Sequence, residues 1–277
     1  MPELPEVELV ASALREIIVG RRIIASEILR ARLIPSSTPE DFTRLLRGAG
    51  IESVKRRGKH ILIELDNTLV LIVHLRMSGR FLLLPREAVL PKFTHAIFYM
   101  DDDKRLVFSD QRHFGTMKIV PANELHSAKE LRSLAPEPFS DEFTPAYLRR
   151  ALSISRRTLK ETLLDQTKVT GLGNIYAAEA MFLARVNPFI VASEFSARRV
   201  PRLHQAILDV FNESIRHGST LNVDPQNIDG SYYGGAYEGL WRVYDRENEP
   251  CIVCRAQVRR VSHGGRSTYF CPRCQRR

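Results

Sequence analysis

Cysteine is absent from the first 250 residues of this 277-residue chain, and long apolar runs are absent throughout. No apolar run approaches the roughly 20 residues that a bilayer-spanning helix needs. The N-terminus is acidic rather than basic and has no apolar signal-peptide segment. These absences exclude a membrane protein and a secreted protein, and they predict a cytoplasmic location.

The composition is that of an ordinary globular protein with an excess of positive charge. Hydrophobic residues make up 44% and charged residues 26% of the chain, which is long enough for two domains with separate cores. Lys and Arg number 41 against 32 Asp and Glu, so the net charge is +9. This charge suits a polyanionic partner, most often nucleic acid, although basic proteins with other roles are common.

All four cysteines lie near the C-terminus, as Cys251, Cys254, Cys271 and Cys274. Two CxxC pairs at this separation are typical of a four-thiolate zinc site. The alternative is a pair of disulfides, but a cytosolic protein normally keeps its thiols reduced. The sequence therefore predicts one structural zinc ion.

The chain begins Met1-Pro2-Glu3-Leu4-Pro5-Glu6. If Met1 is removed, which the small Pro2 permits, the proline nitrogen becomes a secondary amine that can attack an aldehyde carbon. A free α-amino group has a pKa of roughly 7.7–8.0, so part of it is nucleophilic near neutral pH. Glu3 would supply a carboxyl beside it. The alternative is that Pro2 and Pro5 only stiffen the start of a helix.

Hydrophobic periodicity divides the chain into two parts. It predicts a helix from about Pro5 to Ile18, then short strands from Arg22 to about Val120 that would form a sandwich or barrel. A stiff linker follows at residues 134–139, after which the period is helical. Helices are expected from Pro145, from Ser155, over residues 175–184 with Asn174 as N-cap, and over 200–216, followed by a mobile loop at 217–240.

Two features of the second part could hold a phosphate. The turn Gly171-Leu172-Gly173-Asn174 allows close backbone approach and precedes the N-terminus of a helix, although an ordinary helix–helix turn would look the same. Two short strands flank Gly264-Gly265, which predicts a hairpin within the zinc segment. Arg266 would project from this metal-held tip as an anion clamp; the alternative is a solvated arginine.

Three features of the first part allow two interpretations each. Lys59 lies in a run of positive charges at the entrance to a strand, where a solvated face is the usual explanation. Met77 and Phe114 are apolar residues beside glycines and polar residues. Core packing is their default role, but wedges that enter a base stack have the same sequence pattern.

Taken together, these motifs resemble the formamidopyrimidine-DNA glycosylase family of base-excision repair enzymes. The resemblance spans the chain in the family's order, through the Pro-Glu-Leu-Pro-Glu start, the Lys59 and Met77 segments, Asp110 to Gly115, Pro136-Glu137-Pro138, Asp165 to Ala177, and Gly265 to Gln275. It implies an α+β fold, with an N-terminal helix and β-sandwich domain (1–133), a linker (134–142), a helix–two-turn–helix domain (143–240) and a β-hairpin zinc finger (241–277).

The resemblance also implies a bifunctional DNA glycosylase and abasic-site lyase that excises oxidised purines. Pro2 would form a Schiff base with the sugar C1′, Glu3 would protonate the ring oxygen, and Lys59 and Arg266 would serve in β- and δ-elimination. Residues implied to contact DNA are His74, Met77, His95, Arg112, Phe114, Arg156 and Asn174. The expected partner is damaged double-stranded DNA, bound by a monomer in the bacterial nucleoid, with no membrane partner.

Two departures from the family pattern limit these expectations. Residues 220–240, which cover the flipped base in the family, have an unusual sequence, so the preferred lesion and opposite base stay open. Arg156 and Arg157 match a basic family position only approximately. Two alternatives therefore stay open, an endonuclease VIII-like enzyme for other oxidised bases and a non-catalytic protein that binds DNA damage.

Overall fold

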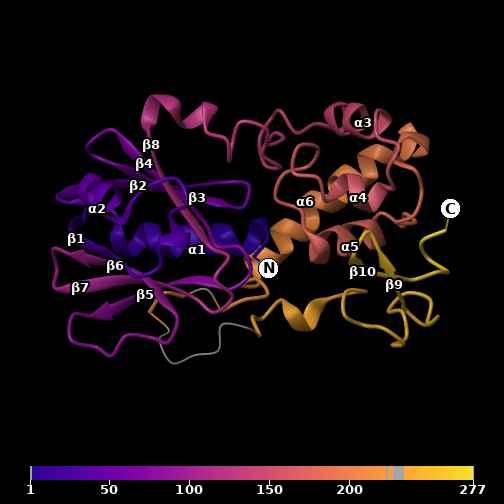
Figure 1. Ribbon diagram of the computed structural model, residues 1–277. Helices are drawn as coiled ribbons and strands as arrows, with labels where there is room; N and C mark the ends of the chain where they lie inside the picture. The colour runs from indigo at the N-terminus through magenta and orange to yellow at the C-terminus, as the bar shows by residue number, and fades with distance from the viewer. Residues whose placement is uncertain (1, 223, 227–233, 277) are drawn as a thin grey trace. The chain divides into compact units, whose positions relative to one another are not determined.

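The computed structural model describes residues 2–222, 224–226 and 234–276, drawn as ribbons in Figure 1. The chain forms two compact units, Met1–Arg132 with Leu221–Gly235, and Ser133–Thr220 with Ala236–Arg277. The predicted α+β class is confirmed, with a β-sandwich, a helical part and a four-cysteine hairpin. Part of the expected lesion-covering loop, at 223 and 227–233, lies outside the described residues.

The first unit contains one long helix and eight strands. Helix α1 (Leu4–Ile18) agrees with the predicted helix. The strands are β1 (Arg22–Ile28), β2 (Ala49–Arg57), β3 (His60–Leu65), β4 (Leu69–His74), β5 (Gly79–Pro85), β6 (Thr94–Met100), β7 (Lys104–Asp110) and β8 (Thr116–Pro121). They are ordered β5-β7-β6-β1-β2-β3-β4-β8, and neighbouring strands run antiparallel.

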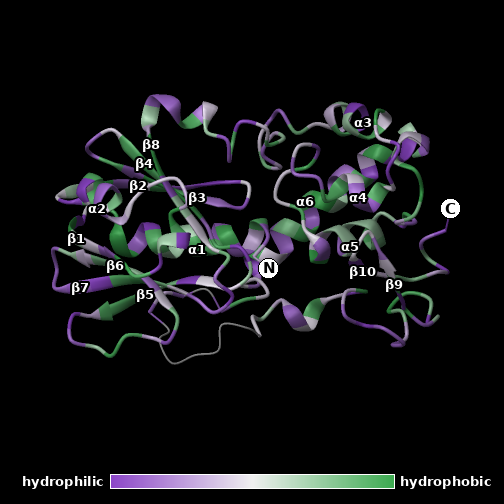
Figure 2. Ribbon diagram, viewed as in Figure 1, coloured by the Kyte–Doolittle hydropathy of each residue, from purple (hydrophilic) through white to green (hydrophobic). Residues whose placement is uncertain are grey.

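One hydrophobic core holds the helix and the sheet together. The apolar positions of α1 (Val7, Val10, Ala11, Leu14 and Ile18) are buried with residues from both halves of the sheet, such as Val54, Ile63, Phe81 and Phe98. In Figure 2 the hydrophobic colour is concentrated in strands such as β5, and the connecting loops are mostly hydrophilic. The core therefore presents the loops at the strand ends on a rigid support.

A short helix interrupts the region that the sequence analysis expected to contain only strands. Helix α2 (Pro39–Leu46) begins after Thr38, whose hydroxyl accepts a hydrogen bond from the Asp41 N–H at 3.1 Å. Phe42 and Leu46 are its buried residues. A capping threonine followed by proline is a helix-start signal. The helix could therefore have been predicted from Thr38 and Pro39, but the apolar runs around it favoured strands.

The second unit is mainly helical. Its α-helices are α3 (Pro145–Ser153), α4 (Leu159–Leu163), α5 (Asn174–Leu183) and α6 (Val200–Arg216), with strands β9 (Arg259–His263) and β10 (Arg266–Phe270) near the C-terminus. The expected start of α4 at Ser155 is wrong, because Thr158 is the residue that caps the helix. No helix among the described residues is long and apolar enough to cross a membrane.

Candidate active site and zinc centre

The N-terminal proline lies just outside the first helix. The N-cap of α1 is Glu3, and Pro5, not Pro2, occupies the first turn. Glu3 and Glu6 form a capping box, in which the Glu3 N–H donates to Glu6 Oε2 at 2.9 Å. Pro2 is buried and Glu3 is 2% exposed. The helix-start alternative therefore accounts for Pro5 and leaves Pro2 unexplained.

Lys59 is buried, so the solvated-face interpretation is wrong for this residue. It follows Gly58, whose φ of +59° makes the tight turn between β2 and β3, and it is 6% exposed. Its positive charge also helps to lower the pKa of His74, which identifies the two as electrostatic neighbours. Buried lysines are rare without a functional or structural partner.

His74 is held as a neutral imidazole. Burial, followed by the charges of His60, Arg76 and Lys59, lowers its pKa to about 2. Its Nδ1 accepts the Arg76 backbone N–H at 3.0 Å. The remaining proton must therefore sit on Nε2, where it can donate to an anionic oxygen.

The loops that carry Met77, Arg112 and Phe114 are joined by one buried carboxylate. Asp110, which is 0% exposed, accepts hydrogen bonds from the Ser78 hydroxyl and from the Gly115 N–H at 2.7 Å. Together these contacts fix the β4–β5 and β7–β8 loops to each other.

Two of the three side chains expected to act as wedges, Arg112 and Phe114, are exposed. Phe114 is 44% exposed, which excludes the core-packing alternative for it, and Met77 is half-buried. The Arg112 guanidinium lies 5.5 Å from the centre of the Phe114 ring. An exposed aromatic stacked on an arginine is a surface suited to unpaired bases.

His95 is buried behind a second histidine that the sequence analysis did not assign. The Nε2 atom of His95 lies 2.8 Å from Nδ1 of His113, and the two rings are nearly parallel. His95 is 3% exposed, and burial lowers its pKa; the Asp110 carboxylate opposes this shift and His113 adds to it. His95 is therefore held by His113, whose side chain is itself half-buried.

In the second unit, the glycine turn is held by a glutamine. Gln166 Oε1 accepts the Gly171 N–H at 2.9 Å, and its Nε2 donates to the Leu172 carbonyl at 2.8 Å. The expected N-cap role of Asn174 is wrong, because Gly173 is the N-cap and Asn174 is the first helical residue. The Asn174 Nδ2 instead donates to the Ser267 carbonyl of β10 at 3.0 Å.

Lys160 reaches the same carbonyl from α4. Its Nζ donates to the Ser267 carbonyl at 2.8 Å and to Thr268 Oγ1 at 2.7 Å. Burial, then the nearby Arg266 charge, lowers the pKa of Lys160 to about 8. Arg266 itself is exposed and makes no ion pair with any described residue, so its guanidinium is available to an anion.

The basic residues before α4 behave differently from each other. Arg157 pairs with Asp165, whereas Arg156 is exposed and has no ion-pair partner within the described ranges. Of the two approximate matches, Arg156 is therefore the better candidate for a phosphate.

The four cysteines form a site that fits a zinc ion. Their sulfurs all lie within 4.8 Å of one another, with Cys251–Cys274 at 3.9 Å and Cys254–Cys271 at 3.4 Å. Tetrahedral coordination with zinc–sulfur bonds of about 2.3 Å requires sulfurs about 3.8 Å apart. Backbone N–H groups of Val253 and Cys274 point at Cys251 and Cys271 sulfurs, as thiolates require.

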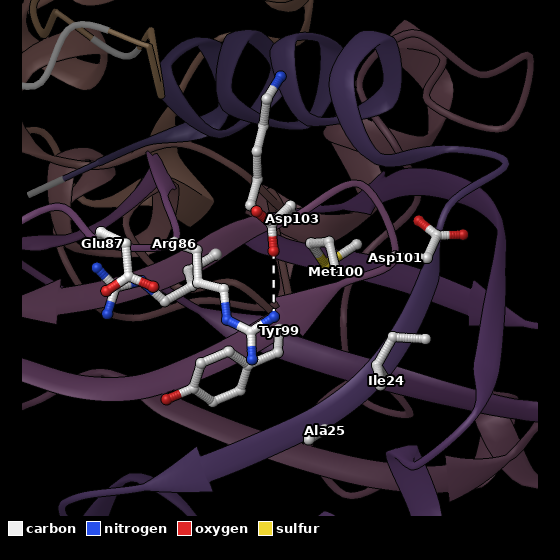
Figure 3. A pocket seen from close by; sticks show the side chains of 10 residues that line it. Ile24, Ala25, Arg86, Glu87, Tyr99, Met100, Asp101 and Asp103 are labelled. Carbon is white, nitrogen blue, oxygen red and sulfur yellow. Dashed lines mark hydrogen bonds and ion pairs between the residues drawn. The ribbon is translucent and has the colours of Figure 1, made fainter.

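A separate hollow of about 660 Å³ lies beside β1, β6 and β7 of the first unit (Figure 3). Its lining includes Arg86 and Asp103, which form an ion pair at 3.1 Å. Its remaining charged residues are Glu87, Asp101, Lys104 and Arg105. The three positive and three negative charges cancel, so this hollow has none of the charge expected of a phosphate site.

Sequence reasoning missed one residue in each unit. Asp110 holds the loops that carry Met77 and Phe114, and Lys160 holds the hairpin strand that carries Arg266. For Asp110 a signal existed, since an aspartate before a tight turn often accepts backbone N–H groups. Lys160 gave no signal, because a lysine inside a short helix is usually solvated.

The fold and these sites define a class, a zinc-finger protein built from a helix-and-sandwich unit and a helix–two-turn–helix unit. Family models match the formamidopyrimidine-DNA glycosylase N-terminal domain over residues 1–117 and its H2TH domain over 134–224. A model of the zinc finger found in FPG and IleRS matches residues 248–277. The chain belongs to the formamidopyrimidine-DNA glycosylase family.

Relatives and solved structures match along the whole chain. The formamidopyrimidine-DNA glycosylase of Cytobacillus firmus is 40% identical over 277 residues, covering 99% of this chain and 100% of the relative. That of Desulforamulus reducens is 36% identical, covering 100% and 99%. Lactococcus lactis Fpg, in a complex with DNA containing an oxidized pyrimidine, is 31% identical with a TM-score of 0.92, covering all of both chains.

Proposed function

We propose that this chain is a base-excision repair enzyme that removes oxidised purines from double-stranded DNA and then cleaves the abasic site. The observation that carries the proposal is the position of Pro2. It lies outside helix α1, next to the buried N-cap residue Glu3. Helix α1 begins and is capped without Pro2. A structural role in the helix therefore does not explain Pro2, which favours a chemical role. Membership of the family supports the same role.

In the proposed mechanism, removal of Met1 frees the Pro2 nitrogen. This nitrogen attacks C1′ of the damaged nucleotide and the bond from C1′ to the base breaks, which leaves Pro2 bonded to the closed sugar ring. Glu3 then protonates the ring oxygen, the bond from C1′ to that oxygen breaks, and the opened sugar is joined to Pro2 as an iminium ion. Loss of a C2′ proton then expels the 3′ phosphate, and a second elimination, assisted by Arg266, expels the 5′ phosphate.

Delivery of the sugar to Pro2 requires the nucleotide to leave the duplex. Extrusion costs a few kcal/mol, which wedges and phosphate contacts can offset. We assign the wedge role to Met77, Arg112 and Phe114, and base pairing with the orphaned partner to Arg112. Lys59, His74, Asn174 and Arg156 are assigned to phosphates, with His113 holding His95. The phosphate contacts are ionic and read no base, so binding should weaken as salt rises whatever the sequence.

The zinc ion has a structural role in this proposal. Held by Cys251, Cys254, Cys271 and Cys274, it would stabilise the hairpin that carries Arg266. We further propose that the protein acts as a monomer in the cytoplasm, and that residues 134–142 link the sandwich domain to the helical domain.

A second substrate class has specific support. Lactococcus lactis Fpg has been crystallised with DNA containing an oxidized pyrimidine and also with DNA containing Fapy-dG. An assay of the enzyme must therefore compare oxidised purines with oxidised pyrimidines.

Borohydride trapping tests the proposal directly. Duplexes carrying 8-oxoguanine, a formamidopyrimidine, an oxidised pyrimidine or an abasic site are incubated with the protein, and borohydride reduces any iminium ion to a stable adduct. We expect an adduct that disappears in Pro2→Glu, whose larger second residue retains Met1 and so blocks the amine, and that persists in Pro5→Gly, the matched control. Absence of an adduct on the abasic duplex, with Met1 removal verified by intact mass, would show the mechanism to be wrong.

A further inference from the structure

A hollow of about 570 Å³ lies between α3 and the beginning of α6 in the second unit. Its size is within the range of about 300–1,000 Å³ that is usual for ligand pockets. It is lined by residues of α3 from Pro145 to Ser153, and by Ala197, Val200 and Pro201. The lining residues of α3 recur at intervals of three or four positions, so they share one face of that helix. We call this hollow the α3–α6 groove.

Most of the lining of the groove is apolar. The apolar residues are Pro145, Ala146, Ala197, Val200 and Pro201. The two prolines lie in the first turns of α3 and α6, and a proline has no backbone N–H to offer a ligand. The one hydroxyl of the lining, on Ser153, donates to the Arg150 carbonyl at 3.0 Å. The groove therefore suits an apolar side chain better than a neutral polar group.

The positive charge of the groove is not compensated. Arg149 and Arg150 line the groove and are exposed, and neither forms an ion pair with another residue that the structure describes. Neither α3 nor the segment 195–208 contains an acidic residue. Arg198 and Arg202, close to the lining residues in sequence, are exposed as well. The hollow beside β1, β6 and β7 differs, because its charges cancel. The α3–α6 groove therefore attracts an anionic ligand.

The apolar lining and the two arginines together indicate the chemistry of that ligand. A guanidinium forms paired hydrogen bonds with a carboxylate, and an apolar side chain next to the carboxylate can cover the rest of the lining. A DNA backbone is bound through its phosphates, for which proteins supply backbone N–H groups and polar side chains besides arginines. The prolines and the Ser153 hydroxyl, which is already bonded, supply few of these. The groove thus favours an acidic peptide with apolar residues over a nucleic acid.

We propose that the α3–α6 groove docks an acidic peptide segment of a partner protein. Carboxylates of the segment pair with Arg149 and Arg150, and an apolar residue between them packs against Val200 and its neighbours. None of the residues that line the groove is assigned to catalysis or to DNA contact, so this role is separate from the proposed function. The groove would bring the enzyme to a protein that carries such a segment.

The test measures fluorescence anisotropy of labelled synthetic peptides added to the full chain with zinc bound. The probe is a short peptide that repeats Glu-Leu-Glu-Pro. A Gln-Leu-Gln-Pro peptide lacks the carboxylates, and a Glu-Ser-Glu-Pro peptide lacks the apolar side chains. We expect the probe to bind with a Kd below about 1 mM, and each of the other peptides to bind about tenfold more weakly. Binding of the probe should also weaken as salt rises, because its ion pairs are exposed.

Two variants locate the binding in the groove. Arg149→Ala/Arg150→Ala should weaken binding of the probe about tenfold, since it removes two exposed ion pairs. Ala146→Glu keeps both arginines but places a carboxylate in the groove, and we expect a similar loss. Position 146 is exposed and lies in the first turn of α3, where a negative charge is compatible with the helix. Cleavage of a duplex with an abasic site should be unchanged in both variants.

Two matched controls remove the effect of net charge. Arg44→Ala/Arg47→Ala takes two exposed arginines from α2 in the first unit, and Ala122→Glu repeats the alanine substitution at an exposed position of that unit. Both should bind the probe as the wild type does.

Four results would overturn the proposal. They are no binding of the probe at about 1 mM, equal binding of the Gln-Leu-Gln-Pro peptide, equal losses in the controls, and displacement of the probe by an undamaged duplex whose own affinity falls tenfold in Arg149→Ala/Arg150→Ala. The last result would identify the groove as a nucleic-acid site.

Discussion

The two units hold the side chains that we assign to DNA contact by opposite electrostatic means. In the first unit, Asp110 is a buried acceptor that collects a hydroxyl and backbone N–H groups from two loops. In the second unit, Lys160 and Asn174 are donors that converge on one carbonyl, that of Ser267. The loops beside Met77 and Phe114 direct N–H groups toward Asp110, whereas the hairpin directs a carbonyl toward Lys160. The anchor of the first unit, Asp110, is therefore negative, and the anchor of the second unit, Lys160, is positive.

This difference gives the two anchors different responses to pH. Burial raises the pKa of Asp110, but the Ser78 hydroxyl and the Gly115 and Arg112 N–H groups outweigh it, and the net shift is downward. The pKa of Lys160 is lowered to about 8. Asp110 therefore keeps its negative charge above the acid range, and Lys160 loses its positive charge in mild alkali.

The largest expected effect comes from removing the metal, which supports only the second unit. Structural zinc contributes roughly 10–16 kcal/mol of apparent binding energy in small zinc fingers. In Cys254→Ser we expect loss of zinc and fast amide hydrogen exchange over β9 and β10, while exchange in the first unit's sheet is unchanged. Weaker DNA binding should follow, since Arg266 loses its support.

Val253→Ser is the matched control, because it introduces the same side chain at an exposed neighbouring position. It should retain zinc and slow exchange. If exchange in β3 and β4 rises together with that in the hairpin, the two units do not fold separately. If DNA affinity survives zinc loss, the hairpin is not a clamp.

A smaller effect is expected from neutralising the anchor of the first unit. Asp110→Asn preserves the shape but turns an N–H₂ group toward backbone N–H groups or the Ser78 hydroxyl. A buried donor left without an acceptor costs about 1–3 kcal/mol. We expect that loss in urea unfolding of the first unit, followed by hydrogen exchange, together with reduced binding to lesion duplexes. Asp103→Asn, whose side chain is 78% exposed, should change little, and an equal loss in both variants would remove Asp110 from its anchoring role.

Much of this molecule could be predicted from sequence because its signals are local. The periodicity of α1 and α6, the Thr144-Pro145 start of α3 and the glycine turn of the hairpin depend on neighbouring residues, and the structure confirms them. The zinc site needed only the spacing of four cysteines.

The contacts that hold the site depend on partners far along the chain and gave no such signal. Lys160 bonds to residues 107 and 108 positions away, and Asn174 to one 93 away. The local pattern predicts Asn174 as an N-cap, and no residue near it in the sequence indicates its contact with Ser267. His113 and His95, 18 residues apart, meet only because β6 and β7 are paired.

The smallest expected effect concerns Lys160. Its contribution to stability rises with pH, whereas a lysine whose pKa is raised by folding contributes less as the pH rises. The folded pKa of Lys160, about 8, lies below its ordinary value of 10.5, so between these values the unfolded chain binds the extra proton. Stability from this group therefore rises with pH across that window, while the neutral amine can still donate to Ser267 and Thr268.

Lys160→Met should lose about 1–2 kcal/mol near pH 7, because the Thr268 hydroxyl and the Ser267 carbonyl lose a donor. The gap between wild type and variant in calorimetric melting should widen from about pH 8 upward, whereas Lys168→Met should show neither effect. A gap that narrows with rising pH would mean that the charge of Lys160, and not its hydrogen bonds, holds the hairpin.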